Sequence, residues 1–233
     1  MTFLEHLEEL RWRIIYSLIG IVIGTIIAWI FIDFFIDKVL LLPAVHAGFK
    51  LQNLRPFGQL FLYFQVAMII GLIISFPNVV YQLWKFIAPA LKTNEKKYIK
   101  WIVLFTTFCF LSGVAFAYFL MLPLTLKFAA GFGSAAIQNN FSIEEYFSII
   151  MSIILGAGLI FELPMLSFFL SKIGILKPSF MKKYRRHAIV VIMILAAVLS
   201  PGTDPVSQIM LAIPLVFLYE VSILVSKISQ KKS

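Results

Sequence analysis

The chain has 233 residues with a formal net charge of +9, and 61% of the residues are hydrophobic while only 13% are charged. With a mean hydropathy of +0.97, this composition excludes an ordinary soluble domain and is typical of a polytopic membrane protein. In such a protein the basic charge belongs to cytoplasmic loops, so it is not evidence for binding to nucleic acid. The single cysteine, Cys109, excludes an internal disulfide and a multi-cysteine metal site.

The chain opens with an acidic segment, residues 3–11, ahead of its first apolar run. Apolar residues recur at three- and four-residue spacing, which predicts a helix with one apolar face. Three carboxylates on the remaining positions are unusual beside an anionic membrane surface. They could satisfy the helix N-terminus and its dipole. Alternatively, this face meets a cation such as an arginine of a partner. The acids are Glu5, Glu8 and Glu9.

Six apolar runs approach the ~20 residues that a helix needs to cross the hydrocarbon core of a bilayer. The fifth is short and the sixth is modest in length, and the outer loop 33–59 is apolar enough to fold back on the membrane surface. We therefore predict an all-α protein with one six-helix transmembrane domain over residues 1–233. The runs are 14–32, 60–80, 99–121, 146–170, 187–200 and 209–226.

The basic residues predict the orientation of these spans. Of the 20 Lys and Arg residues, 16 fall in the two terminal segments and in the segments after the second and fourth spans. Only four fall in the alternate segments. Because Lys and Arg accumulate on the cytoplasmic side, both termini are expected in the cytoplasm.

Glu162 lies within the fourth apolar run. A carboxylate at this depth marks a pathway, a proton relay or a partner contact, and its alternative is a neutral side chain hydrogen-bonded to a neighbouring helix. Pro164 removes a backbone donor, which predicts a kink beside it. Gly156 and Gly158 would let another helix approach closely.

Two further acids have simpler interpretations. Glu95 stands among lysines, where a local ion pair contributes little. Asp204 lies in a Pro-Gly-Thr-Asp-Pro turn. The three histidines lie in separate segments without metal-ligand spacing, and no phosphate-binding loop is present. We expect neither an enzyme, nor a metal site, nor a cofactor.

Five motifs in order along the chain resemble the TatC family, the core membrane subunit of the twin-arginine protein translocase. The first two are the most specific, and together they span most of the chain. They are FLEHLEELR at 3–11, YQLWKFIAPAL at 81–91, FAYF at 116–119 followed by Pro123, FELP at 161–164 and SPGTDPVSQ at 200–208.

The resemblance implies a membrane receptor and scaffold that recognises twin-arginine signal peptides on folded cargo. It implies single-span partner subunits of the TatA and TatB type, a homo-oligomer in the assembled complex, and use of the proton motive force without nucleotide. The expected location is a prokaryotic cytoplasmic (inner) membrane.

The family motifs also imply roles for individual residues. Glu9 and Glu95 match the acids that bind the signal arginines, with Glu8 sharing the acidic position beside Glu9. Glu162 matches the intramembrane acid of the fourth span. The neighbouring recognition positions are Arg11, Phe86 and Pro89. Further functional candidates are Pro43 and Asp204.

A different class of function is a proton-coupled carrier of small solutes that uses Glu162 as its proton site. The acidic N-terminal helix favours the receptor, because a carrier does not need it. The absence of a visible internal inverted repeat also weakens the carrier hypothesis.

Overall fold

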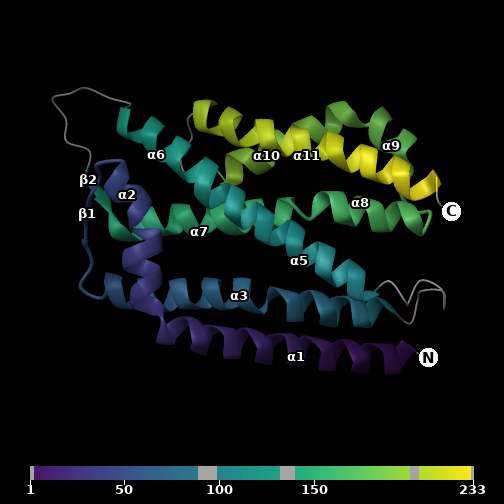
Figure 1. The fold of residues 1–233 in the computed structure, drawn as a ribbon, viewed down its shortest axis with the longest axis horizontal. Coiled ribbons are helices and arrows are strands. Elements are labelled where there is room, and N and C mark those ends of the chain that lie inside the picture. The colour runs from purple at the N-terminus through teal and green to yellow at the C-terminus, as the bar shows by residue number, and fades with distance from the viewer. Residues whose placement is uncertain (1–2, 89–98, 132–139, 200–204, 232–233) are drawn as a thin grey trace. The chain divides into compact units, whose positions relative to one another are not determined.

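The computed structural model describes residues 3–88, 99–131, 140–199 and 205–231, and it is helical apart from one small sheet (Figure 1). The all-α prediction is thus confirmed. In chain order the elements are α1 (Phe3–Ile30), the π-helical η1 (Phe34–Leu40), α2 (Leu42–His46), β1 (Lys50–Gln52), α3 (Gly58–Ile87), α5 (Ile99–Phe116), the π-helical η3 (Ala117–Met121), α6 (Leu122–Gly131), β2 (Asn140–Ser142), α7 (Ile143–Ile160), α8 (Leu163–Lys172), α9 (Pro178–Lys183), α10 (Arg185–Leu199) and α11 (Pro205–Lys231).

Five helical stretches in the described part of the chain are long and apolar enough to cross a membrane. The fifth predicted span corresponds to α10, whose 15 residues rise about 22 Å, less than a typical hydrocarbon core. Its crossing of the membrane, and with it the six-span topology, stays a prediction. The five stretches are Leu4–Ile30, Gly58–Ile87, Ile99–Gly131, Ile143–Lys172 and Leu211–Ser229.

The described residues form two compact units, and α5 and α7 each contribute to both. Described residues of Met1–Leu42, Gln52–Phe108 and Ser142–Phe147 make the first unit. Those of Pro43–Leu51, Cys109–Phe141 and Ser148–Ser233 make the second. The single transmembrane domain over residues 1–233 stays a prediction.

In the first unit α1 and α3 lie side by side and antiparallel (Figure 1). Glycines allow this contact, because a Cβ on Gly24 would come within 2.5 Å of the Gly71 carbonyl oxygen. A Cβ on Gly71 would in turn clash with the backbone nitrogen of Thr25. Backbones that approach this closely are typical of small-residue helix packing in membranes. The contact fixes which residues of α1 meet which residues of α3.

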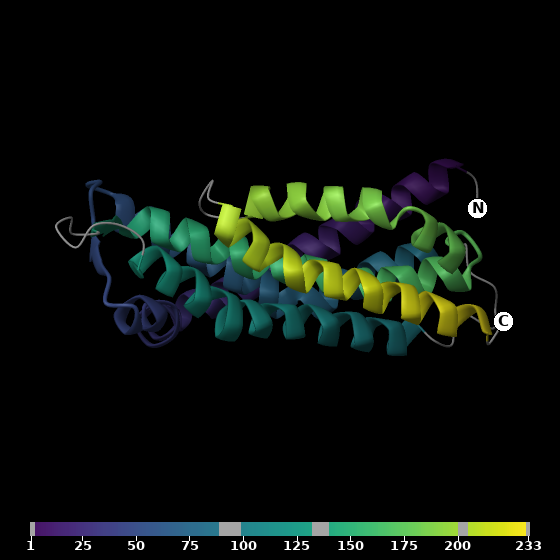
Figure 2. The same cartoon turned by 90° about the horizontal axis from the view of Figure 1, so that it is seen from above.

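In the second unit α11 packs along α8 and α10, and Figure 2 shows α10 beside α11. Buried hydroxyls join α8 to α11, since Ser171 and Ser226 share a hydrogen bond and Ser229 donates to the carbonyl oxygen of Phe168. Hydroxyl contacts of this kind replace the water that a lipid-embedded surface lacks.

The predicted kink in the fourth span is confirmed as a break between two helices. Helix α7 ends at Ile160, and α8 begins at Leu163 with Pro164 in its first turn. The predicted close approach at Gly158 is also present, because a Cβ there would lie 2.7 Å from the Phe110 ring. A Cβ on Gly113 of α5 would meet the Ala157 carbonyl oxygen at the same distance.

Enlarging Gly71 tests whether α1 and α3 need their backbone contact. We expect Gly71→Leu to lower the thermal stability of the purified protein in detergent, because backbone atoms of α1 cannot move aside as a side chain could. Overpacking of this kind costs about 1–3 kcal/mol. Gly131→Leu is the control, since a Cβ at Gly131 meets nothing within 4 Å. Equal stability of both variants would contradict the proposed packing constraint.

Candidate functional site

A polar cluster joins α1 to α3 within the first unit, near the N-terminal end of α1. The Nη2 group of Arg13 donates to Oε1 of Glu9 at 3.0 Å, and Nη1 donates to Oε1 of Gln82 at 3.2 Å. The amide of Gln82 donates to Asn78, and Asn78 donates to the carbonyl oxygen of Tyr16. Arg13 is therefore held by both helices.

The cluster leaves two polar atoms without a hydrogen-bond partner among the described residues. Oε2 of Glu9 and Nε of Arg13 are both buried and unpaired. The two side chains are only 19% and 18% exposed, respectively. A carboxylate oxygen that is out of bulk water and unpaired costs free energy until a donor reaches it. The geometry thus leaves Glu9 with capacity for one more strong donor.

The sequence-predicted neighbours of Glu9 differ in exposure. Glu8 and Arg11 are exposed, whereas Glu9 is partly buried in the cluster. Phe86 is half-buried near the end of α3 and stacks on the ring of His6 at 4.4 Å between ring centroids. The structure therefore brings Glu9 and Phe86 to adjoining parts of one helix pair, with Glu9 rather than Glu8 on the side that faces α3.

Sequence reasoning did not select Arg13, Gln82 or His6. Arg13 could have been found from its four-residue spacing after Glu9, which favours an ion pair on a helix surface. Gln82 and His6 could not, because their contacts depend on the pairing of α1 with α3. Three predicted site residues lie outside the described residues: Pro89, Glu95 and Asp204.

Glu162 occupies the break between α7 and α8 within the second unit and is 7% exposed. Its carboxyl group lies within hydrogen-bonding reach of the Phe110 backbone and close to Cys109 of α5. Oε1 of Glu162 has no hydrogen-bond partner among the described residues. The predicted intramembrane acid is thus buried and only partly satisfied.

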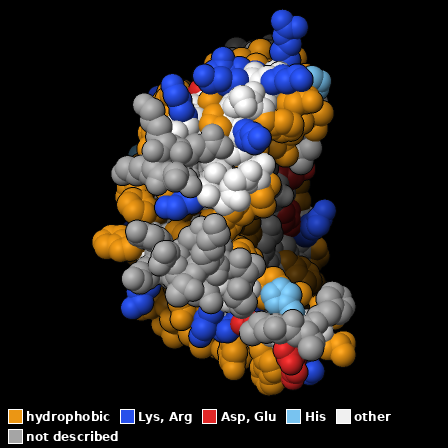
Figure 3. Space-filling model, turned by 90° about the vertical axis from the view of Figure 1, so that its right-hand side faces the viewer, with side chains coloured by type: hydrophobic (Ala, Val, Ile, Leu, Met, Phe, Trp, Pro, Cys, Tyr) orange, Lys and Arg blue, Asp and Glu red, His pale blue; other side chains and the backbone are white. Residues whose placement is uncertain are grey.

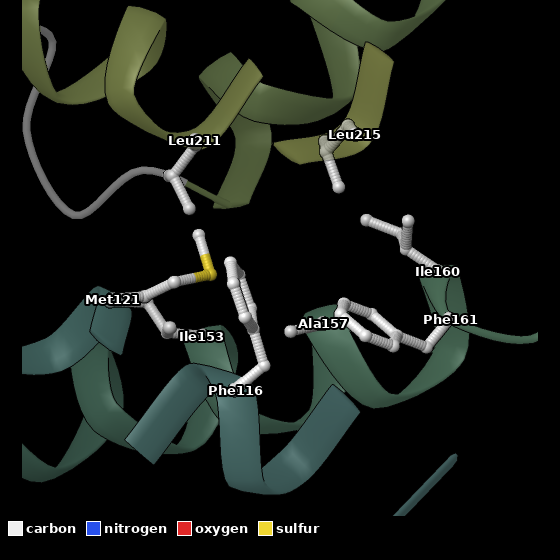
Figure 4. A pocket seen from close by; sticks show the side chains of 8 residues that line it. All are labelled: Phe116, Met121, Ile153, Ala157, Ile160, Phe161, Leu211 and Leu215. Carbon is white, nitrogen blue, oxygen red and sulfur yellow. The ribbon is translucent and has the colours of Figure 1, made fainter. Parts of the chain in front are cut away.

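A small apolar pocket lies next to this break (Figure 4). Residues of α5, η3, α7 and α11 line it, and Phe161 connects it to the neighbouring Glu162. The lining side chains carry no acid, base or nucleophile, so the pocket is not a site for chemistry. They are Phe116, Met121, Ile153, Ala157, Ile160, Phe161, Leu211 and Leu215.

Pro43 lies in the short α2 of the predicted outer loop, where its carbonyl oxygen accepts from the Ala47 amide. The loop is thus partly helical. Within the second unit, basic side chains gather where α8, α9 and α10 meet, on the side viewed in Figure 3. At this end Arg185 donates to Glu220 at 2.6 Å, and both side chains are nearly half exposed. Over the described residues no group of three or more His, Cys, Asp or Glu side chains could hold a metal.

These features define the class of the protein: a multi-pass helical membrane protein with a buried acid in one span and, on α1, an ion pair that is hydrogen-bonded to α3. Residues 5–214 match the family profile described as Sec-independent protein translocase protein (TatC). The chain belongs to the TatC family.

Relatives and solved structures agree with this assignment. The chain is 38% identical over its full length to a TatC protein of Carboxydothermus hydrogenoformans, covering 95% of that protein. It is 34% identical over its full length to a TatC protein of Aquifex aeolicus, covering 97% of that protein. A crystal structure of the twin-arginine translocase receptor TatC superposes with a TM-score of 0.86, at 34% identity, over 96% of this chain and 99% of that one.

The family assignment decides between the two functions left open by the sequence. The chain is a component of a Sec-independent protein translocase that works with other members of that system, and the family is not one of catalytic enzymes. The carrier hypothesis for Glu162 is therefore disfavoured, while the role of this acid in translocation stays to be tested.

We predict that Glu162 acts by its polarity inside the bilayer rather than by holding the fold together. Glu162→Ala should fold and insert normally but impair export of a reporter or crosslinking to partner subunits, because interhelical polar contacts in membranes average well under ~2 kcal/mol. Glu162→Gln should be milder, since the amide keeps hydrogen-bonding capacity.

The control for Glu162 is Ser167→Ala, which removes an equally buried polar group from α8. Loss of folded protein in Glu162→Ala alone would indicate a structural role. Equal loss of export in the Ala and Gln variants, with assembly intact, would indicate proton coupling. Thermal stability in detergent, partner crosslinking and export should be measured on the same preparations.

Proposed function

We propose that the chain is the receptor and scaffold subunit of a twin-arginine translocase in a prokaryotic cytoplasmic membrane. In this role it binds the paired arginines of signal peptides on folded cargo. It recruits single-span subunits of the TatA and TatB type, forms homo-oligomers in the assembled complex, and uses the proton motive force. Membership of the TatC family supports the proposal at the level of the translocase.

The observation that carries the recognition step is the Glu9 carboxylate. One of its oxygens is held by Arg13, and the other has no hydrogen-bond partner among the described residues. A guanidinium presents planar N–H groups that match carboxylate oxygens, and such charge-assisted hydrogen bonds are stronger than neutral ones. Phe86 adds an aromatic face to the same end of the helix pair.

The two arginines of a signal peptide need two separated hydrogen-bond acceptors. Glu95 follows α3 in the chain, and the family resemblance makes it the second carboxylate, with Pro89 among the neighbouring recognition positions. Glu8 and Arg11 are exposed near Glu9, where they can contact the rest of a bound peptide. Pro43 and Asp204 belong to the opposite, outer side of the predicted topology and have no part in this binding step.

Glu9→Gln tests the proposed binding site. The amide has the same shape but no charge, so affinity for a twin-arginine peptide should fall by the ~2 kcal/mol or more expected for a charge-assisted contact. Glu95→Gln should have a similar effect. Labelled peptide titrated into the detergent-solubilised protein gives the dissociation constant.

Glu145→Gln is the matched control, because Glu145 is an exposed acid in the first turn of α7. Its affinity should equal that of the wild type. Unchanged affinity in both Glu9→Gln and Glu95→Gln would remove the recognition role assigned to these two acids.

The proposed topology has its own test. Reporters placed after Gly202 and within 122–145 should be accessible from outside, whereas reporters within 172–186 and at the C-terminus should be inside. The reason is the distribution of 16 and four basic residues between alternate segments. A C-terminal reporter on the outside would mean that α10 does not cross the membrane.

A further inference from the structure

The junction of α9 and α10 carries positive charge for which the proposed peptide site has no use. Four basic residues fall within five positions there, all within the second unit, and all four side chains are exposed. Basic side chains gather on this side of the molecule in Figure 3. Like charges so close together repel one another, so the cluster gains from a counter-charge. The four residues are Lys182, Lys183, Arg185 and Arg186.

Acidic side chains supply only part of that counter-charge. Over the described residues of the second unit the acids are Glu162 and Glu220. Glu220 accepts a hydrogen bond from Arg185 at 2.6 Å, and Glu162 is buried in the break between α7 and α8. The exposed cations that remain are called the basic patch: Lys182, Lys183 and Arg186.

Helix α10 places the basic patch at the edge of a surface that faces lipid. Arg186, Val190 and Ile194 recur every four residues, so they lie along one face of the helix. Val190 and Ile194 are each 59% exposed. In a multi-pass membrane protein an exposed apolar stripe of this kind faces hydrocarbon. Arg186 therefore stands where this stripe ends, and its long stem can carry the guanidinium to the level of the headgroups.

Aromatic rings lie beside the basic patch. The rings of Phe180 and Tyr184 are 4.5 Å apart between centroids, and those of Tyr184 and His187 are 5.4 Å apart. The ammonium nitrogen of Lys183 lies 5.9 Å from the centre of the Tyr184 ring. Phe180 is 54% exposed although it is fully apolar. Exposed aromatic side chains among cations are typical of the membrane–water interface, so this row favours a lipid surface over an acidic protein.

The support beneath the basic patch is fixed by α11. The hydroxyl of Tyr219 donates to the carbonyl oxygen of Met181 at 2.8 Å, and the next residue, Glu220, holds Arg185. Met181 is buried. These contacts hold α9 and the start of α10 on α11, so the cations are grouped before any ligand arrives, which lowers the entropic cost of binding.

We propose that the basic patch is a binding site for anionic phospholipids. Lys182, Lys183 and Arg186 contact the phosphate group, and the acyl chains lie along Val190 and Ile194. Ammonium and guanidinium groups form charge-assisted hydrogen bonds with phosphate oxygens. A zwitterionic lipid offers the same phosphate but brings a cation of its own, so it binds more weakly. This activity goes beyond signal-peptide recognition and does not depend on it.

The test is binding of phosphatidylglycerol to the purified full chain, with phosphatidylcholine as the reference lipid. Native mass spectrometry of the protein in detergent, at one salt concentration, gives an apparent affinity for each lipid. Each basic residue near an anionic membrane surface contributes about fivefold. Lys182→Gln/Lys183→Gln/Arg186→Gln should therefore bind phosphatidylglycerol at least about tenfold more weakly, while its affinity for phosphatidylcholine changes little.

The matched control removes three exposed cations from the predicted outer loop: Lys38→Gln/Lys50→Gln/Arg55→Gln. It lowers the net charge by the same amount and should keep the wild-type affinity for phosphatidylglycerol.

Single substitutions keep the test decisive if the triple variant gives no folded protein. Lys183→Gln and Arg186→Gln should each weaken phosphatidylglycerol binding by about fivefold. Arg186→Lys, which retains the charge, should bind more tightly than Arg186→Gln.

Three results would overturn the proposal. Equal weakening in the patch variant and in the outer-loop control would show a response to net charge alone. Equal weakening for both lipids in the patch variant would show a loss of packing rather than recognition of an anion. Unchanged binding of phosphatidylglycerol in the patch variant would show that these cations bind no lipid. If that variant then lost affinity for a labelled glutamate-rich peptide, the basic patch would be assigned to an acidic protein instead.

Discussion

The backbone contact between α1 and α3 at Gly24 and Gly71 is the constraint on which the candidate recognition site depends. In a bilayer, helices gain little from burying apolar side chains against one another, because lipid is equally apolar. Close backbone packing and a few polar contacts therefore set the register of a helix pair. That register places Arg13 opposite Gln82 and His6 opposite Phe86. A small shift of one helix would dismantle both contacts.

In the second unit, hydrogen bonds of buried hydroxyl groups join α8 to α11. Hydroxyl groups of α8 and α11 pair with each other or with backbone carbonyls, so few polar atoms remain for lipid to cover. Among the described residues of this unit, the exception is Glu162, which has an unpaired oxygen at the break before Pro164. Glu162 thus differs from these serines in keeping hydrogen-bonding capacity that no described residue uses.

Features that depend on local sequence could be predicted, and features that depend on helix pairing could not. Long apolar runs located the helices because a membrane demands about 20 such residues, and Pro164 located the break because proline lacks a donor. Glu9 and Glu162 stood out as acids in unusual surroundings. The partners of those acids come from other helices: Gln82 acts through Arg13, and Phe110 adjoins Glu162.

Two further features could not be predicted for other reasons. The sequence of the predicted outer loop 33–59 is apolar, but its π-helical η1 and its short α2 carry no periodic signal over so few residues. Glu95 illustrates the opposite case: its charge pattern favoured a local ion pair, and only the family motif singled it out. A residue whose partner is an external ligand is hard to recognise from the charge and hydropathy pattern of its own chain.

The shortness of α10 has a consequence for the lipid around it. If α10 crosses the bilayer as the basic residues predict, its length of about 22 Å leaves a deficit of about 8 Å against a 30 Å hydrocarbon core. Neighbouring acyl chains must then shorten or tilt, at a fraction of a kcal/mol for each ångström. In that case the membrane beside α10 would be held under elastic strain, and this strain would grow with acyl-chain length. The protein would therefore be sensitive to the thickness of its host membrane even where no lipid is specifically bound.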